Sequence, residues 1–181
     1  MGPFPHEAEP PQIDAHNPMG TGGFEFVEYA HPEPQVLHDL FRQMGFAPVA
    51  RHRSKAITLY RQGDVNYLVN EEPGSQGFNF VAAHGPCAPS MAFRVVDAEA
   101  AYQRALALGA EPADPADGAK ALDVPAVKGI GGSLLYFVDT YGQKGSVYDA
   151  AFEWLGERDP RPAGDGPVSY THLTLPTNRE V

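Results

Sequence analysis

The chain has 181 residues, 43% of them hydrophobic and 20% charged, which is typical of one globular domain. Thirteen Lys and Arg against 23 Asp and Glu give a net charge of −10, which repels nucleic acid and anionic lipid, so we expect neither as a partner. The single cysteine, Cys87, excludes an internal disulfide framework. No apolar run approaches the roughly 20 residues of a membrane helix, and the first twelve residues lack a signal-peptide core, so we expect a cytoplasmic protein.

Proline, glycine and charge divide the chain into segments. Residues 1–22 are rich in proline and lack periodicity, which predicts a flexible N-terminal arm. Residues 23–155 hold the periodic segments and are predicted to form the folded domain. Residues 156–167 are charged and then rich in proline and glycine, as in a linker. Residues 168–181 resemble a translated sequencing adaptor, so we interpret them as a non-native tail.

Residues 23–72 predict a β-α-β-β-β module. Bulky and polar residues alternate over residues 23–30, which indicates a strand. A helix is predicted from Gln35 to a glycine stop at Gly45. Its apolar residues at helical spacing are Val36, Leu37, Leu40, Phe41 and Met44. Three short strands are predicted to follow, at residues 48–52, 56–61 and 65–70, with a hairpin turn at residues 62–64.

Residues 90–150 predict a second module, after a connector at residues 73–89 in which residues 78–81 favour a short strand. A strand at residues 90–96 leads to Asp97 as a helix N-cap. The helix, residues 98–108, has a predicted apolar face of Ala101, Tyr102, Ala105 and Leu108. The remaining predicted strands lie at residues 111–113, 119–127 and 133–139, with an edge strand at 145–150 and with Phe152 and Trp154 closing the core.

Landmarks of the two modules recur in the same order. Phe26 and Phe93 are 67 positions apart, and the Tyr-Leu-Val-Asn run at residues 67–70 is matched 69 positions later by Tyr-Phe-Val-Asp. Such repetition indicates a duplicated unit, and two copies are too few for a solenoid. We therefore predict an α+β domain in which two tandem modules close on each other in one curved mixed sheet.

No complete active site is visible in the sequence. His31 and His38 are seven residues apart, whereas paired ligands on one helix face are three or four apart. His6 and His16 lie in the predicted arm, and His52 and His84 are isolated. The glycine-rich residues 129–132 precede a strand, not a helix, so they predict a tight turn and not a phosphate site. We therefore expect no catalytic, cofactor-binding or metal-binding residue in this chain.

Several longer segments resemble the 4-hydroxyphenylpyruvate dioxygenase family, and the paired modules resemble the vicinal-oxygen-chelate (glyoxalase/bleomycin-resistance) superfamily. The resemblance covers residues 20–166, and it is carried by residues 23–29, 52–63, 65–73, 84–86, 90–95 and 129–139. It implies a non-haem Fe(II) enzyme of tyrosine breakdown that converts 4-hydroxyphenylpyruvate and O₂ to homogentisate and CO₂. A triad of two histidines and one carboxylate would leave positions on the iron open for the keto acid and O₂.

In that family the triad lies in the C-terminal half, and this chain resembles the N-terminal half, which has the same fold and no metal. The resemblance thus implies an inactive fragment, whose partners are its own missing C-terminal domain and, at full length, further copies of the same protein. His172-Leu173-Thr174 resembles the start of the family's iron-binding strand, His-Leu-Thr-His. Leu175-Pro176 departs from that motif, so His172 is not expected to be a native ligand.

Two other interpretations stay open. The N-terminal half of 4-hydroxymandelate synthase, which uses the same substrate, is not separated from the dioxygenase by any residue of this chain. A stand-alone, metal-free two-module binding protein is a different class. The linker-like residues 161–164 favour a connection to another domain over that third interpretation.

Overall fold

The structure is a computed structural model that describes residues 11–163. Its helices and strands follow the chain in the order β1 (Thr21–Ala30), α1 (Gln35–Gln43), β2 (Ala47–His52), β3 (Ile57–Gln62), β4 (Val65–Asn70), α2 (Gln76–His84), β5 (Cys87–Val95), α3 (Ala98–Ala107), β6 (Ala126–Lys128), β7 (Leu134–Val138) and β8 (Phe152–Trp154). Across this described range, no helix has the length and apolar character needed to span a membrane.

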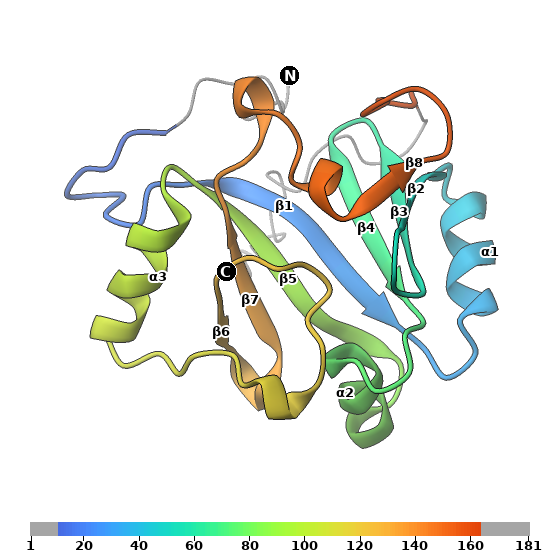
Figure 1. The fold of residues 1–181 in the computed structure, drawn as a ribbon, viewed down its shortest axis with the longest axis horizontal. Helices are drawn as coiled ribbons and strands as arrows, with labels where there is room; N and C mark the ends of the chain where they lie inside the picture. Colours follow the sequence, from blue (N-terminus) through green and yellow to red (C-terminus); the bar gives the residue numbers. More distant parts are fainter. Residues whose placement is uncertain (1–10, 164–181) are drawn as a thin grey trace, which may run out of the picture.

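All eight strands form one mixed sheet in the order β6-β7-β5-β1-β4-β3-β2-β8 (Figure 1). Each module opens with a strand that pairs in parallel with a later strand of the same module, β1 with β4 and β5 with β7. The two opening strands, β1 and β5, pair antiparallel at the centre and join the modules. The predicted duplication and the predicted α+β fold in one curved sheet are confirmed.

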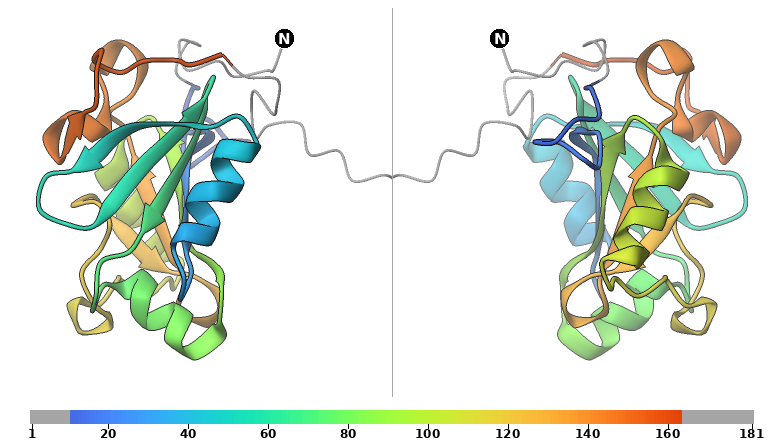
Figure 2. Two further views of the ribbon diagram at one scale, coloured as in Figure 1. Left: turned by 90° about the vertical axis from the view of Figure 1, so that its right-hand side faces the viewer. Right: turned by 90° about the vertical axis from the view of Figure 1, so that its left-hand side faces the viewer.

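The two faces of the sheet are covered differently (Figures 1 and 2). Helices α1 and α3 pack on one face, over separate apolar clusters that include Phe41 and Tyr67 in the first module and Ala101 and Phe137 in the second. We call the other side the loop face, because the segments between α3 and β6 and between β7 and β8 cover it. The cluster on the loop face includes Phe26, Leu59, Leu68, Leu122, Tyr136 and Tyr148.

Helix α1 is amphipathic, but its buried stripe is narrower than predicted. Leu37 and Phe41, one turn apart, are buried against the sheet. Val36, Leu40 and Met44, also spaced by four residues, form a second stripe that is exposed. Val36 and Leu40 lie about 100° around the helix from Leu37 and Phe41, which turns them away from the sheet, and Met44 follows at the C-cap.

The connector contains a helix, so the predicted strand at residues 78–81 is wrong. Ser75 caps α2, because its hydroxyl oxygen accepts a hydrogen bond from the Phe78 N–H at 3.1 Å. The other predicted cap is confirmed: Asp97 accepts from the Ala100 N–H at 2.8 Å at the start of α3. The predicted apolar face of α3 is wrong at Leu108, which is 75% exposed.

The second module is less regular than predicted. Residues 111–113 contribute only an isolated bridge, between Pro112 and Val127, and the predicted strand 119–127 is reduced to β6. The predicted edge strand at 145–150 is wrong, because Val147–Ala150 forms a 3-10 turn. Strand β8 crosses instead to the first module and pairs with β2.

The first part of the predicted linker is held on the domain. Arg61 of β3 is fully buried and its Nη1 donates to Asp159 at 2.7 Å and to the Pro160 carbonyl at 3.0 Å. The Gly63 N–H donates to the Pro162 carbonyl at 2.8 Å. Residues 156–163 therefore leave the sheet along a fixed path. The predicted tail, residues 168–181, lies outside the described residues, as do His6 and the rest of residues 1–10 of the predicted arm.

Candidate functional site

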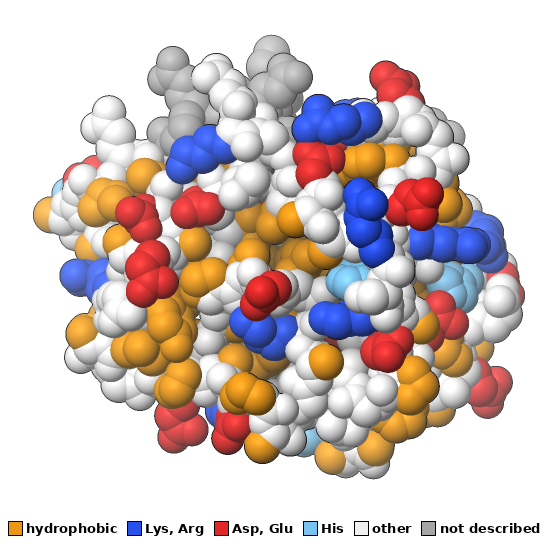
Figure 3. All heavy atoms as spheres, viewed as in Figure 1, with side chains coloured by type: hydrophobic (Ala, Val, Ile, Leu, Met, Phe, Trp, Pro, Cys, Tyr) orange, Lys and Arg blue, Asp and Glu red, His pale blue; other side chains and the backbone are white. Residues whose placement is uncertain are grey.

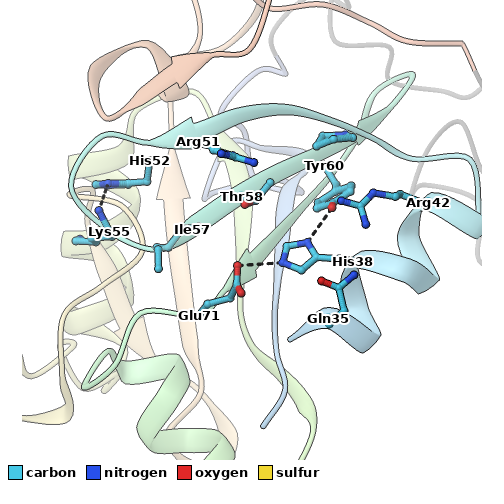
Figure 4. A pocket seen from close by; sticks show the side chains of 12 residues that line it. Gln35, His38, Arg42, Arg51, His52, Lys55, Ile57, Thr58, Tyr60 and Glu71 are labelled. Carbon is cyan, nitrogen blue, oxygen red and sulfur yellow. Dashed lines mark hydrogen bonds and ion pairs between the residues drawn. The ribbon is translucent and has the colours of Figure 1, made fainter. Parts of the chain in front are cut away.

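A pocket of about 380 Å³ lies between α1 and the β2–β3 hairpin (Figure 4). Strand alternation builds its floor, since Thr58 and Tyr60 point to the helix side while Ile57 and Leu59 pack on the loop face. His38 reaches in from α1, and Glu71, directly after β4, closes one side.

His38 is held between two partners in this pocket. Its Nε2 lies 3.0 Å from Oε2 of Glu71, and its Nδ1 lies 2.8 Å from the Tyr60 hydroxyl. A carboxylate only accepts, so Nε2–H donates to Glu71. In the neutral imidazole the other nitrogen is then an acceptor, and the Tyr60 O–H donates to Nδ1. Both ring nitrogens are satisfied, which fixes the orientation of the ring.

Positive charge predominates around the pocket. Arg42, Arg51 and Lys55 line it, against the single carboxylate of Glu71. Figure 3 shows Lys, Arg and His side chains on the side of the molecule that carries β2 and α1, with Asp and Glu side chains between them, and hydrophobic side chains in the centre of the view. The residues that line the pocket thus carry a positive excess within a chain whose net charge is −10.

The surroundings shift the pKa of two side chains of the pocket, Tyr60 and His52. Burial raises the pKa of Tyr60, and the Glu71 carboxylate raises it further against the opposing effect of Arg42. Tyr60 is therefore a hydroxyl donor at neutral pH and not a base. Burial, together with the positive charge of Lys55, lowers the pKa of His52. An uncharged His52 accepts hydrogen bonds at Nδ1 from two backbone N–H groups of its own turn, those of Ser54 and Lys55.

A second set of polar side chains is buried on the loop face, where it joins strands of both modules. Nε of Arg94 on β5 donates to Oε2 of Glu25 on β1 at 2.6 Å. Asn66 of β4 donates to the Glu25 carbonyl at 2.8 Å and accepts from Nε of Arg61 at 2.6 Å. Arg61 also lies 5.5 Å from the centre of the Tyr148 ring. These bonds tie the two modules together.

Glu28 is the buried carboxylate at the junction of three strands. It accepts hydrogen bonds from the Ser90 hydroxyl of β5 and, at 2.6 Å, from the Asn70 amide of β4. Burial raises the pKa of Glu28, and these two bonds only partly oppose the shift. A carboxylate with two satisfied oxygens and no histidine beside it is a structural crosslink.

The described residues do not fit an iron site. No group of three His, Cys, Asp or Glu side chains lies close enough to hold a metal ion within residues 11–163. Fe(II) of the facial-triad type needs two histidines and a carboxylate. Glu28 has asparagine and serine beside it, and His38 has one carboxylate and a phenol. The chemistry that these residues support is binding and proton donation through hydroxyl groups.

The other histidines lie apart from the pocket or only at its edge. His31 accepts from the Glu33 N–H in the turn after β1, and His84 stacks on Phe80 at 4.1 Å. His52 lines the pocket but turns its Nδ1 to its own loop. His172 lies outside the described residues. Residues 129–132 form a 3-10 turn before β7, with positive φ at Gly131 and Gly132, in agreement with the predicted turn.

The sequence did not reveal the grouping of His38, Tyr60 and Glu71, because they come from a helix, a strand and a loop that are up to 33 positions apart. One signal was present, since Tyr60 lies on a strand face and Glu71 at a strand end of a predicted hairpin that follows the helix. The contacts of His38 with Tyr60 and Glu71 follow only from the position of α1 on the sheet.

Comparisons with known proteins agree on one family. The family model described as "Hydroxyphenylpyruvate dioxygenase, HPPD, N-terminal" matches residues 15–153. The chain is 49% identical over 158 residues to 4-hydroxyphenylpyruvate dioxygenase of Pseudomonas sp. (strain P.J. 874), a match that covers 87% of this chain and 44% of that protein. The chain thus spans less than half the length of these curated relatives, including Hemolysin VllY of Vibrio vulnificus and the 4-hydroxyphenylpyruvate dioxygenase of Pseudomonas aeruginosa.

Two solved structures are similar to this one. A xylose isomerase-like TIM barrel/4-hydroxyphenylpyruvate dioxygenase fusion protein is 40% identical, with a TM-score of 0.66, over 81% of this chain and 22% of that chain. A mutant of 4-hydroxymandelate synthase from Streptomyces coelicolor is 20% identical, with a TM-score of 0.61, over 79% of this chain and 43% of that chain. At that identity the second likeness concerns the fold alone.

Proposed function

Because the chain belongs to the family of hydroxyphenylpyruvate dioxygenase N-terminal domains, we propose that it is the non-catalytic N-terminal domain of a 4-hydroxyphenylpyruvate dioxygenase. The complete enzyme converts 4-hydroxyphenylpyruvate and O₂ to homogentisate and CO₂ in tyrosine breakdown. The observation that carries this proposal is the 49% identity to such a dioxygenase over 158 residues. The iron site belongs to the remainder of the enzyme, since the residues described here do not fit one.

The role of this domain is to support the catalytic half and to contribute to subunit contacts. The exposed apolar stripe of α1, formed by Val36, Leu40 and Met44, supports this role, because contact surfaces of this kind are built from neighbouring apolar side chains. The fixed path of residues 156–163 supports it as well, since a chain held by Arg61 presents whatever follows in a defined direction.

A 4-hydroxymandelate synthase is the second candidate for the parent enzyme. The observation in its favour is the shared fold of its solved structure. Identity favours the dioxygenase, at 49% against 20%. The two parents share a substrate and differ in product, so product analysis separates them.

The test is to read the source gene through and beyond the codon for Gly166, and to express both the complete protein and the 181-residue chain. Each is supplied with Fe(II), 4-hydroxyphenylpyruvate and O₂, and homogentisate and 4-hydroxymandelate are measured by chromatography. We expect homogentisate from the complete protein and neither product from the 181-residue chain. Turnover by the short chain, or a gene that ends at Val181, would overturn the proposal.

A further inference from the structure

We propose that the pocket between α1 and the β2–β3 hairpin binds a small organic acid, with its carboxylate held by Arg51 and its neighbours. This assigns a ligand site to a domain whose proposed role is structural, and it does not depend on that role. The pocket volume of about 380 Å³ lies within the usual range for small-molecule sites, roughly 300–1,000 Å³.

The positive side chains that line the pocket outnumber its carboxylates. The side chain of Arg51 makes no hydrogen bond or ion pair with any other described residue, although Glu153 lies opposite it on β8. Lys55 donates through Nζ to the Lys120 carbonyl at 2.5 Å, which directs its ammonium group to the segment between α3 and β6. The pair between Arg42 and Asp39, at 3.4 Å and more than half exposed on both sides, is weak.

The one carboxylate in the pocket is already engaged. Oε2 of Glu71 accepts from Nε2–H of His38, so this oxygen faces the imidazole and not the arginines. An incoming carboxylate therefore meets the guanidinium groups of Arg42 and Arg51. Hydrogen bonds from such cations to a carboxylate are about twice as strong as neutral ones.

The walls of the pocket indicate an organic acid and not a bare inorganic anion. Pro48 and Ala56 line it with apolar surface beside the charged groups. The hydroxyl of Thr58 adds a neutral donor and acceptor on the floor. A ligand with a carboxylate and a hydrocarbon body can bind the arginines through its carboxylate and pack its hydrocarbon part against the apolar residues.

The experiment titrates the 181-residue chain with benzoate at constant ionic strength and follows backbone amide shifts by NMR. Benzamide, which has the same shape without the charge, is the ligand control. We expect saturable shifts centred on the pocket for benzoate and binding about tenfold weaker or more for benzamide, because the charged contact is lost.

Arg51→Gln and Arg53→Gln form a matched pair of variants. Both arginines are exposed on the same hairpin, both changes remove one charge, and only Arg51 lines the pocket. We expect Arg51→Gln to weaken benzoate binding about tenfold or more and Arg53→Gln to leave it within about twofold. Equal losses in the two variants, equal binding of benzamide, or no saturable shift at millimolar benzoate would each overturn the proposal.

Discussion

Replacing Arg94 by methionine tests whether the buried pair of Glu25 and Arg94 holds the two modules together. The side chains are 1% and 5% exposed and their atoms lie 2.6 Å apart, so the values of 0–1 kcal/mol typical of surface pairs do not apply. Methionine fills much of the same volume but leaves the Glu25 carboxylate buried without its cation. Removing one partner of such a pair costs about 3–5 kcal/mol.

That loss is large against a total stability of about 5–15 kcal/mol for a domain. For a chain of this length it lowers Tm by roughly 6–20 °C. Urea unfolding at neutral pH, followed by circular dichroism, measures the free energy directly. Arg53→Met is the control, because Arg53 is exposed and its replacement is expected to change stability by no more than about 0.5 kcal/mol.

The double variant Glu25→Gln/Arg94→Met separates a lost ion pair from poor packing. Glutamine keeps an oxygen facing the Asn66 amide, which lies 3.3 Å from Oε1 of Glu25, and removes the stranded charge. We expect it to recover at least half of the stability that Arg94→Met loses. A loss below about 1 kcal/mol in Arg94→Met, or a double variant as unstable as the sum of the single ones, would refute this reasoning.

Three further perturbations test other parts of the structure. Burial raises the pKa of Glu28 above its ordinary 4.5, so the contribution of Glu28 to stability is fully present below pH 4.5 and is lost as pH rises through the folded-state pKa. Glu28→Gln removes this loss. We therefore expect the unfolding free energy of Glu28→Gln relative to the parent chain, measured by urea unfolding at a series of pH values, to rise with pH. Asp97→Ala removes a helix cap and costs about 1 kcal/mol in the same assay. Asp159→Ala releases the segment after β8 and speeds hydrogen exchange at the Gly63 amide, which donates to Pro162.

Each of these has an outcome that contradicts it. A pH-independent difference for Glu28→Gln would mean that Glu28 is not desolvated as described. An unchanged unfolding free energy for Asp97→Ala would mean that the cap contributes nothing to α3. Unchanged exchange at Gly63 in Asp159→Ala would mean that residues 156–163 are held without their bond to Arg61.

The sequence determined the features that depend on neighbours in the chain. Residues 65–70 were predicted as a strand and form β4 over that same range, because an apolar, β-favouring run between turns leaves little alternative. Asp97 was predicted as a cap and is one, since capping needs only the next three residues. The repeated landmarks predicted the duplication, because they survive insertions between them.

The sequence predictions fail at α2 and at β8 for different reasons. Residues 78–81 alternate aromatic and polar side chains like a strand, whereas the local cap at Ser75 starts the helix α2. The place of β8 beside β2 was not a local property at all. Strand pairing joins backbone groups that are about a hundred positions apart, and no periodicity within either segment encodes the partner.

The pocket was decided by tertiary structure alone. The sequence compares His38 only with His31, seven residues away, because its two actual partners come from a strand and from the loop after the next strand. Packing Leu37 and Phe41 against the sheet sets the rotation of α1, and that rotation carries His38 onto Tyr60 and Glu71. The sequence thus determined which segments form and that they come in two copies, whereas burial of one stripe of one helix decided which polar side chains meet.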